Sequence, residues 1–92
     1  MEKGGQKKGG KQRRNERGIA ILARNVRKYR TEKGLTISQL ALNLEVDYSQ
    51  VSRIERGVVN ATISMIFEIA NELKIPPHQL IEELESDSKI KA

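Results

Sequence analysis

Residues 36–57 read TISQLALNLEVDYSQVSRIERG, and the pattern in this stretch decides the fold. Apolar side chains recur at helical spacing on either side of a single break; they are Leu40, Ala41 and Leu44 before it, and Val51 and Ile54 after it. The break, Glu45-Val46-Asp47, ends with a residue type that accepts a backbone N–H at the start of a helix. The pattern therefore predicts two short helices, at 37–44 and 48–56, joined by a tight turn.

The two predicted helices have the features of a helix-turn-helix. Thr36 is a good N-cap for the first, and Gly57 supplies a left-handed residue that ends the second. Ala41 is small enough to let two helices cross steeply at close range. With Val51 and Ile54 pointing inward, the second helix turns its opposite face toward the outside.

Three further helices are expected around this pair. Helical spacing of apolar residues predicts a long helix at 19–33, ended by Gly34, and another at 63–73. A short fifth helix at 78–84 is expected after Ile75-Pro76-Pro77, because proline suits a first helical turn. No alternating strand pattern is visible in the sequence. The expected fold is all-α, a compact domain of five helices.

The two ends of the chain differ from the domain in composition. Residues 1–17 hold seven Lys or Arg, two acids and four Gly, with no apolar residue beyond Met1, so we expect a disordered basic tail. Two interpretations of this tail stay open: an arm that follows DNA phosphates or enters a minor groove, and a solvated tail. Residues 85–92 are expected to fray, which leaves 18–84 as the domain. The tail carries most of the net charge of +5, so only the placement of basic residues within the domain can indicate a nucleic-acid surface.

Several classes of function lack the residues that they need. The chain has no Cys and one His, His78, so we expect neither a metal site nor a Ser-His or Cys-His nucleophile. The carboxylates of Glu82, Glu83 and Glu85 are expected to form a solvated face. We therefore expect no enzyme activity and no cofactor. No apolar run approaches the ~20 residues that a membrane helix requires, and no signal peptide is recognisable, so the expected location is the cytoplasm.

Particular motifs carry a resemblance to a known family. They are VRKYRTEKGLT at the end of the first helix, QLA in the second, SRIERG in the third, and N-x-T-I followed by IANELKI. From Ile19 to Leu80 the chain resembles the phage-repressor-like (Cro/repressor class) helix-turn-helix transcriptional regulators. The resemblance implies a lambda-repressor-like DNA-binding domain whose third helix lies in the major groove of double-stranded DNA.

The outward face of the helix at 48–56 holds the expected base contacts, which are Tyr48, Ser49, Ser52 and Arg53. Family members make base contacts at the positions of Tyr48, Ser49 and Arg53, so the resemblance implies the same role here. Arg53 is the sharpest candidate, because one guanidinium can bond guanine O6 and N7 together. The alternative is that Arg53 is only a solvated helix arginine.

Phosphate contacts are expected on both sides of that helix, from Thr36, Arg56, Asn60 and Thr62. Helix N-termini favour negative charge, so backbone N–H groups beside Thr36 and Thr62 add to these sites. Such contacts position a protein on DNA without reading its sequence.

Three positions depart from the family pattern: Ile37 stands where a Gln often touches phosphate, Glu45 stands in place of a turn Gly, and Ala61 stands in place of a Pro. A positive φ at Glu45 would cost about 1–2 kcal/mol. The resemblance also implies a partly buried ion pair between Arg30 and Glu55, which would fix the angle of the third helix. Two surface charges are the alternative.

These features favour a sequence-specific, homodimeric transcriptional regulator of repressor or controller type, bound to a palindromic operator. Phe67, Ile81 and Leu84 are the expected dimer contacts. A phage-type repressor, a restriction–modification controller and an antitoxin with a toxin partner all stay open. The rival interpretations are a protein-interaction module that kept the fold with weak or no DNA binding, and RNA binding through the basic tail alone.

Overall fold

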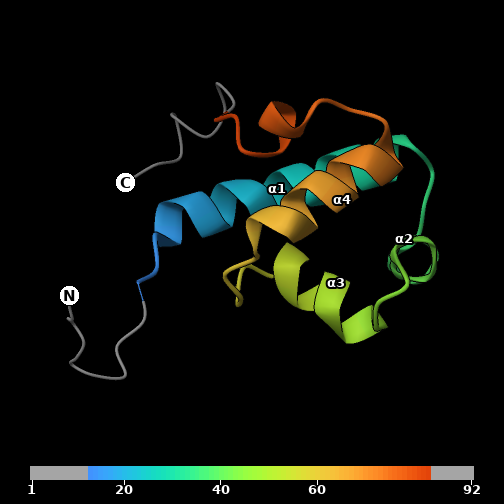
Figure 1. The fold of residues 1–92 in the computed structure, drawn as a ribbon, viewed down its shortest axis with the longest axis horizontal. Coiled ribbons are helices and arrows are strands. Elements are labelled where there is room, and N and C mark those ends of the chain that lie inside the picture. The colour runs from blue at the N-terminus through green and yellow to red at the C-terminus, as the bar shows by residue number, and fades with distance from the viewer. Residues whose placement is uncertain (1–12, 84–92) are drawn as a thin grey trace.

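The structure of the protein, a computed structural model, describes residues 13–83 of the 92-residue chain. The predicted tail up to residue 12 and the predicted frayed end at 85–92 lie outside this range. The described residues form four α-helices followed by a short 3-10 helix and contain no strand, and Figure 1 shows how these elements are arranged. The elements are α1 (Glu16–Glu32), α2 (Ile37–Leu44), α3 (Tyr48–Glu55), α4 (Ile63–Leu73) and η2 (Pro77–Leu80). The all-α prediction is confirmed, and α2 and α4 have the predicted bounds.

The prediction of a fifth helix at 78–84 was wrong. The chain forms only the four-residue 3-10 helix η2 there, with Pro77 in its first turn. Asn25 of α1, which is fully buried, gives the physical reason. Its Nδ2 donates to the carbonyl oxygens of Leu80 and Glu82, both at 2.9 Å. Because these bonds hold the segment at 80–82 against α1, the described residues contain four α-helices and one 3-10 helix in place of the predicted five helices.

α1 begins three residues before the predicted start at Ile19. The side chain of Asn15 caps it by accepting the N–H of Gly18 at 2.7 Å. Glu16 lies in the first turn, where the helix dipole favours negative charge. Glu16 and Arg17, which the sequence placed in the tail, therefore belong to α1.

The core forms where the four α-helices and η2 meet. Its buried side chains are Leu22 and Val26 of α1, Leu40 and Ala41 of α2, Val51 and Ile54 of α3, Ile69, Ala70 and Leu73 of α4, and Leu80 of η2. Full burial of one such aliphatic side chain contributes about 1.5–3 kcal/mol relative to exposure. Packing of α3 against α1, and of α2 against α4, holds the helix-turn-helix on the rest of the domain.

All four α-helices end in the same backbone arrangement. In each, an N–H beyond the helix donates back across five residues: from Leu35 to Arg30, from Val46 to Ala41, from Val58 to Arg53 and from Ile75 to Ala70. The residue before each of these donors is left-handed; they are Gly34, Glu45, Gly57 and Lys74. These bonds satisfy carbonyl groups that a helix leaves open at its end. α1 and α3 end with a glycine in this conformation. α2 and α4 end with Glu45 and Lys74, whose Cβ atoms make the left-handed conformation strained.

Arg30 of α1 and Glu55 of α3 form a nearly buried ion pair. Nε and Nη2 of Arg30 donate to the two carboxylate oxygens of Glu55 at 2.6 and 2.9 Å, and Nη1 donates to the Leu35 carbonyl at 2.7 Å. The two side chains are 12% and 1% exposed. The hydrogen bonds from the guanidinium to Glu55 raise the pKa of Arg30, so this side chain stays charged. The pair ties the end of α3 to α1.

Glycine in place of Glu45 is predicted to stabilise the fold. Glu45 has a φ of 62°, a conformation that costs a residue with a Cβ about 1–2 kcal/mol. Part of that gain is offset by the greater freedom of glycine in the unfolded chain, so Glu45→Gly should raise the free energy of unfolding by about 0.5–1 kcal/mol in urea titrations. Lys74→Gly, at a φ of 59°, is the matched comparison and should give a similar gain. A loss of stability in both variants would contradict the strain argument.

Removal of Arg30 is predicted to destabilise the fold strongly. Arg30→Ala leaves the buried carboxylate of Glu55 without its two short hydrogen bonds and with only the exposed Arg27 nearby, a change that typically costs about 3–5 kcal/mol. Urea denaturation followed by circular dichroism measures the loss. The control is Lys28→Ala, which breaks an exposed ion pair with Glu32 on the same helix and should cost far less. Equal, small losses in both variants would show that the Arg30–Glu55 pair does not support the fold.

Candidate nucleic-acid interface

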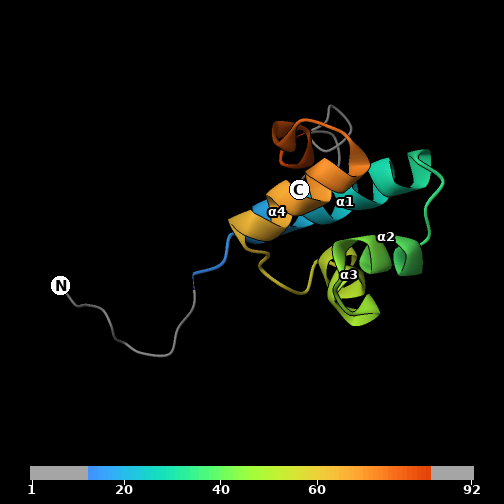
Figure 2. The ribbon, with the colours of Figure 1, turned by 45° about the vertical axis from the view of Figure 1, so that its right-hand side comes forward.

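α3 lies at one edge of the domain in both views of the ribbon (Figures 1 and 2). Its inward side is formed by Val51 and Ile54, which are 0% and 3% exposed. The exposed residues of its outward side are Tyr48, Ser49, Gln50 and Arg53. A helix that offers polar side chains in this way has the dimensions to enter the major groove of B-DNA.

Ser52 and Arg56 lie one turn apart on this helix and contact each other. Nε of Arg56 donates to Oγ of Ser52 at 3.2 Å, and Ser52 is half-buried. The bond holds the Arg56 guanidinium along the helix. Ser52 is therefore less open than Ser49 or Arg53, although it can still donate its hydroxyl hydrogen.

The start of α2 is closed by a reciprocal pair of hydrogen bonds. The Gln39 N–H donates to Oγ1 of Thr36 at 3.0 Å, and the Thr36 N–H donates to Oε1 of Gln39 at 2.8 Å. This is a capping box, so the predicted N-cap is confirmed and Gln39 has a role that the sequence reasoning missed. The spacing of the two residues is the signal that could have found it. Ile37, which stands at the first position of α2, is partly buried and packs against the core.

The start of α3 differs from the prediction. Asp47 occupies the N-cap position, but its side chain makes no capping hydrogen bond. The backbone carbonyl of Asp47 instead accepts the N–H of Gln50 at 3.0 Å. The expected side-chain cap at Asp47 was therefore wrong, and the packing of Val51 and Ile54 holds this helix in place.

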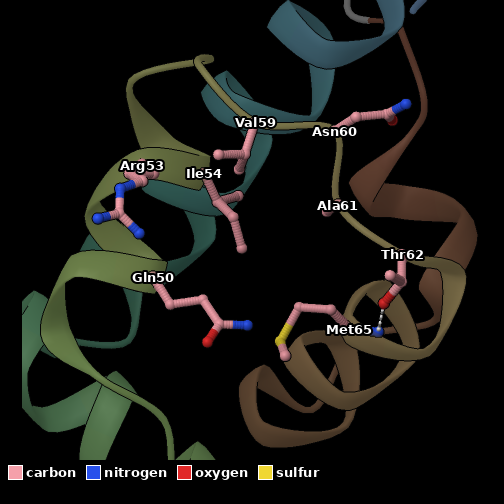
Figure 3. A pocket seen from close by; sticks show the side chains of 8 residues that line it. All are labelled: Gln50, Arg53, Ile54, Val59, Asn60, Ala61, Thr62 and Met65. Atoms are coloured by element: carbon pink, nitrogen blue, oxygen red, sulfur yellow. Dashed lines mark hydrogen bonds between the residues drawn. The ribbon is translucent and has the colours of Figure 1, made fainter. Parts of the chain in front are cut away.

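A pocket of about 200 Å³ lies between α3 and the start of α4 (Figure 3). Equal numbers of apolar and polar residues line it: Ile54, Val59, Ala61 and Met65, and Gln50, Arg53, Asn60 and Thr62. Figure 3 shows Gln50 extending from α3 toward Met65 of α4. The pocket brings three predicted DNA contacts together and adds Gln50, which the sequence reasoning missed. Spacing could have found it, because Gln50 precedes Arg53 by three residues on one helix and a Gln side chain can pair with adenine.

The segment that leads into α4 is held at two points. Nδ2 of Asn60 donates to the carbonyl oxygen of Arg13 at 3.1 Å, which fastens the residues ahead of α1 beside this segment. Oγ1 of Thr62 caps α4 by accepting the N–H of Met65 at 3.1 Å. Both polar side chains are exposed next to α3, where their remaining N–H and O–H groups can donate to an anion.

Large apolar side chains are exposed on α4 and just after η2, two elements that pack against each other. Ile63, Phe67 and Ile81 are 64%, 55% and 56% exposed. Leu84, the third predicted dimer contact, lies outside the described residues. Figures 1 and 2 place η2 on the opposite side of α1 and α4 from α3, so a contact at η2 would lie away from α3.

Neither a metal site nor a membrane-spanning helix is found within residues 13–83. No group of three or more His, Cys, Asp or Glu side chains is placed to hold a metal ion there. No helix in this part of the chain is both long enough and apolar enough to cross a membrane.

Comparison with solved structures gives several similar proteins. The restriction–modification controller protein C.AhdI from Aeromonas hydrophila is 34% identical, with 67% of this chain and 94% of that chain covered and a TM-score of 0.65. A hypothetical transcription factor, NHTF, from Neisseria is 29% identical, with 88% and 94% covered and a TM-score of 0.73. The controller protein C.Esp1396I, as a tetramer in complex with its natural 35 base-pair operator, is 29% identical, with 75% and 91% covered and a TM-score of 0.65.

Comparison with curated protein sequences gave no match. The sequence profile of the HTH_3 family, described as helix-turn-helix, matches residues 26–80, which is more than half of the chain. That match includes α2, α3 and α4 in full. The solved structures that are similar to this chain include proteins described as transcriptional regulators or controllers. The protein therefore belongs to the HTH_3 helix-turn-helix family.

Proposed function

We propose that the protein is a sequence-specific DNA-binding transcriptional regulator that acts as a homodimer. The observation that carries this proposal is the orientation of α3. Its apolar side is buried at Val51 and Ile54, while Tyr48, Ser49 and Arg53 are exposed on the other side. Arg53 would bond a guanine, and Ser49 can donate to or accept from either kind of base.

Phosphate contacts on both sides of α3 would set its depth and register in the groove. Thr36 stands at the start of α2, and Asn60 and Thr62 stand at the start of α4. Arg56, at the end of α3, adds a cation. The complex of the similar protein C.Esp1396I with its operator supports this use of the fold.

A dimer would cover the exposed apolar residues of α4 and η2. One domain offers few base-reading side chains, whereas two copies on a palindrome double the contacts at a half-site spacing of roughly 34 Å. Phe67 and Ile81 are the proposed contacts across the two-fold axis. The repressor or controller role is proposed because two of the similar proteins are restriction–modification controllers.

Selection of bound sites from random double-stranded DNA tests the proposed function. We expect enrichment of a palindrome whose half-sites are centred about one helical turn, roughly 34 Å, apart. Sedimentation of the protein with the enriched duplex should give two copies for each palindrome. Enrichment of no sequence would argue against specific DNA binding, and an enriched site without symmetry would argue against the dimer.

Arg53 and Arg56 are predicted to contribute in different ways. Arg53→Ala should weaken binding to the selected site by about 1–3 kcal/mol for each half-site and should relax the preference at one base pair. Arg56→Ala should weaken selected and random duplexes alike, because a phosphate contact carries no sequence information. Arg53→Lys is the matched control, since it keeps the charge and removes the two-bond geometry. Equal losses on selected and random DNA for Arg53→Ala would remove Arg53 from the base-reading residues.

A further inference from the structure

A second cleft, of about 560 Å³, lies between α1 and the end of α3. On α1 it is lined by residues at helical spacing, among them Ala20, Ala23, Arg24 and Arg27. On the other side it is lined by Arg56 and Gly57, where α3 ends. The cleft therefore joins one predicted phosphate contact, Arg56, to a face of α1 that the proposed function does not use.

Positive charge dominates the lining of this cleft. Three arginines line it, and each of the two carboxylates beside them is bonded to a further arginine outside the lining. Glu16 accepts a hydrogen bond of 2.7 Å from Nε of Arg14, which lowers the pKa of Glu16. Glu55 accepts both short bonds from Arg30 and also forms an ion pair with Arg27, whose Nε lies 3.8 Å from Oε1 of Glu55. The lining thus holds three arginines against two carboxylates, and Arg14 and Arg30 stand beside those carboxylates, so positive charges outnumber negative ones among these described residues.

Small residues keep the cleft open. Ala20, Ala23 and Gly57 contribute no long side chain, and Gly57 is required by its φ of 71°. The N–H groups of Gly57 and Val58 donate to the carbonyl groups of Ile54 and Arg53, which satisfies two of the carbonyl groups at the end of α3. Guanidinium groups around an open space of this kind suit the planar, two-bond recognition of phosphate oxygens.

We propose that the cleft formed by Arg24, Arg27 and Arg56 binds phosphate groups. Two sources share this chemistry: the backbone of DNA that continues past the site read by α3, and a free polyphosphate. The first source rests on the proposed function, since it requires DNA on α3. In that case Arg24 and Arg27 extend the protein's contact beyond the operator half-site, and flanking DNA adds affinity without adding sequence preference.

The first test uses the double variant Arg24→Gln/Arg27→Gln on two duplexes, the selected site with long flanks and the same site trimmed to its half-sites. With flanks present, the affinity should fall by roughly tenfold, and the slope of log affinity against log salt should shrink by about 0.9 for each lost phosphate contact. On the trimmed duplex the variant should match the wild type. The control is Lys28→Gln/Lys33→Gln, which removes the same charge from α1 and its C-cap, outside the cleft, and should show no dependence on the flanks.

The second test uses tripolyphosphate and needs no DNA. Addition of this anion should shift the amide signals of Ala20, Ala23 and Gly57 in the wild type, and the double variant should lose these shifts. Ala20→Glu places a carboxylate in the cleft with every arginine intact and should abolish binding, whereas Ala20→Gln, of the same size and neutral, should retain it. Thermal unfolding of each variant identifies any that fails to fold.

The outcomes distinguish DNA phosphates from a free polyphosphate as the ligand, and they distinguish failure of the cleft proposal from failure of the proposed DNA-binding function. A loss that depends on flanking DNA assigns the phosphates to the DNA backbone, and tripolyphosphate binding alone assigns them to a free anion. Absence of both effects, or equal behaviour of Ala20→Glu and Ala20→Gln, would overturn the cleft as a phosphate site. If the protein selects no DNA at all, the proposed function fails. The tripolyphosphate titration still tests whether the cleft binds phosphate groups.

Discussion

The ion pair between Arg30 and Glu55 is the constraint on which the rest of the arrangement depends. It is nearly buried, it makes two short hydrogen bonds, and a third bond from Arg30 holds the chain where α1 passes into α2. One side chain thus connects α1, the α1–α2 turn and the end of α3. Because the pair ties the end of α3 to α1, it helps to hold the outward face of α3, Arg53 included, in its orientation relative to the rest of the domain.

Local signals in the sequence predicted most of the fold. α2 and α4 have their predicted bounds because a Thr cap precedes each one and a left-handed residue follows it. The prediction failed where tertiary contacts decide the outcome. Helix formation after Pro77 is limited by hydrogen bonds from Asn25, a residue far away in the chain. The early start of α1 was missed for another reason, since Asn15 is a good cap but lies in a stretch whose composition indicated disorder.

The outward face of α3 in the candidate site could also be predicted from local signals, whereas the arginine-lined cleft could not. The inward positions Val51 and Ile54 determine which side chains of α3 face outward, and helical spacing alone gives that result. Spacing also contained the signal for Gln50, which was not used. The arginine-lined cleft carries no such signal, because its two walls come from segments about thirty residues apart that only folding brings together. A basic residue on an exposed helix face looks the same in sequence whether or not a second wall stands opposite it.

The hydrogen bond from Asn60 to the carbonyl of Arg13 has a practical consequence. The bond holds Arg13 beside the segment that leads into α4, next to the surface proposed to bind DNA. A fluorophore or affinity tag fused ahead of residue 13 would begin its path at that surface and could compete with the nucleic acid. η2 stands on the far side of α1 and α4 from α3 (Figures 1 and 2), so a label attached after residue 83 would begin its path away from α3.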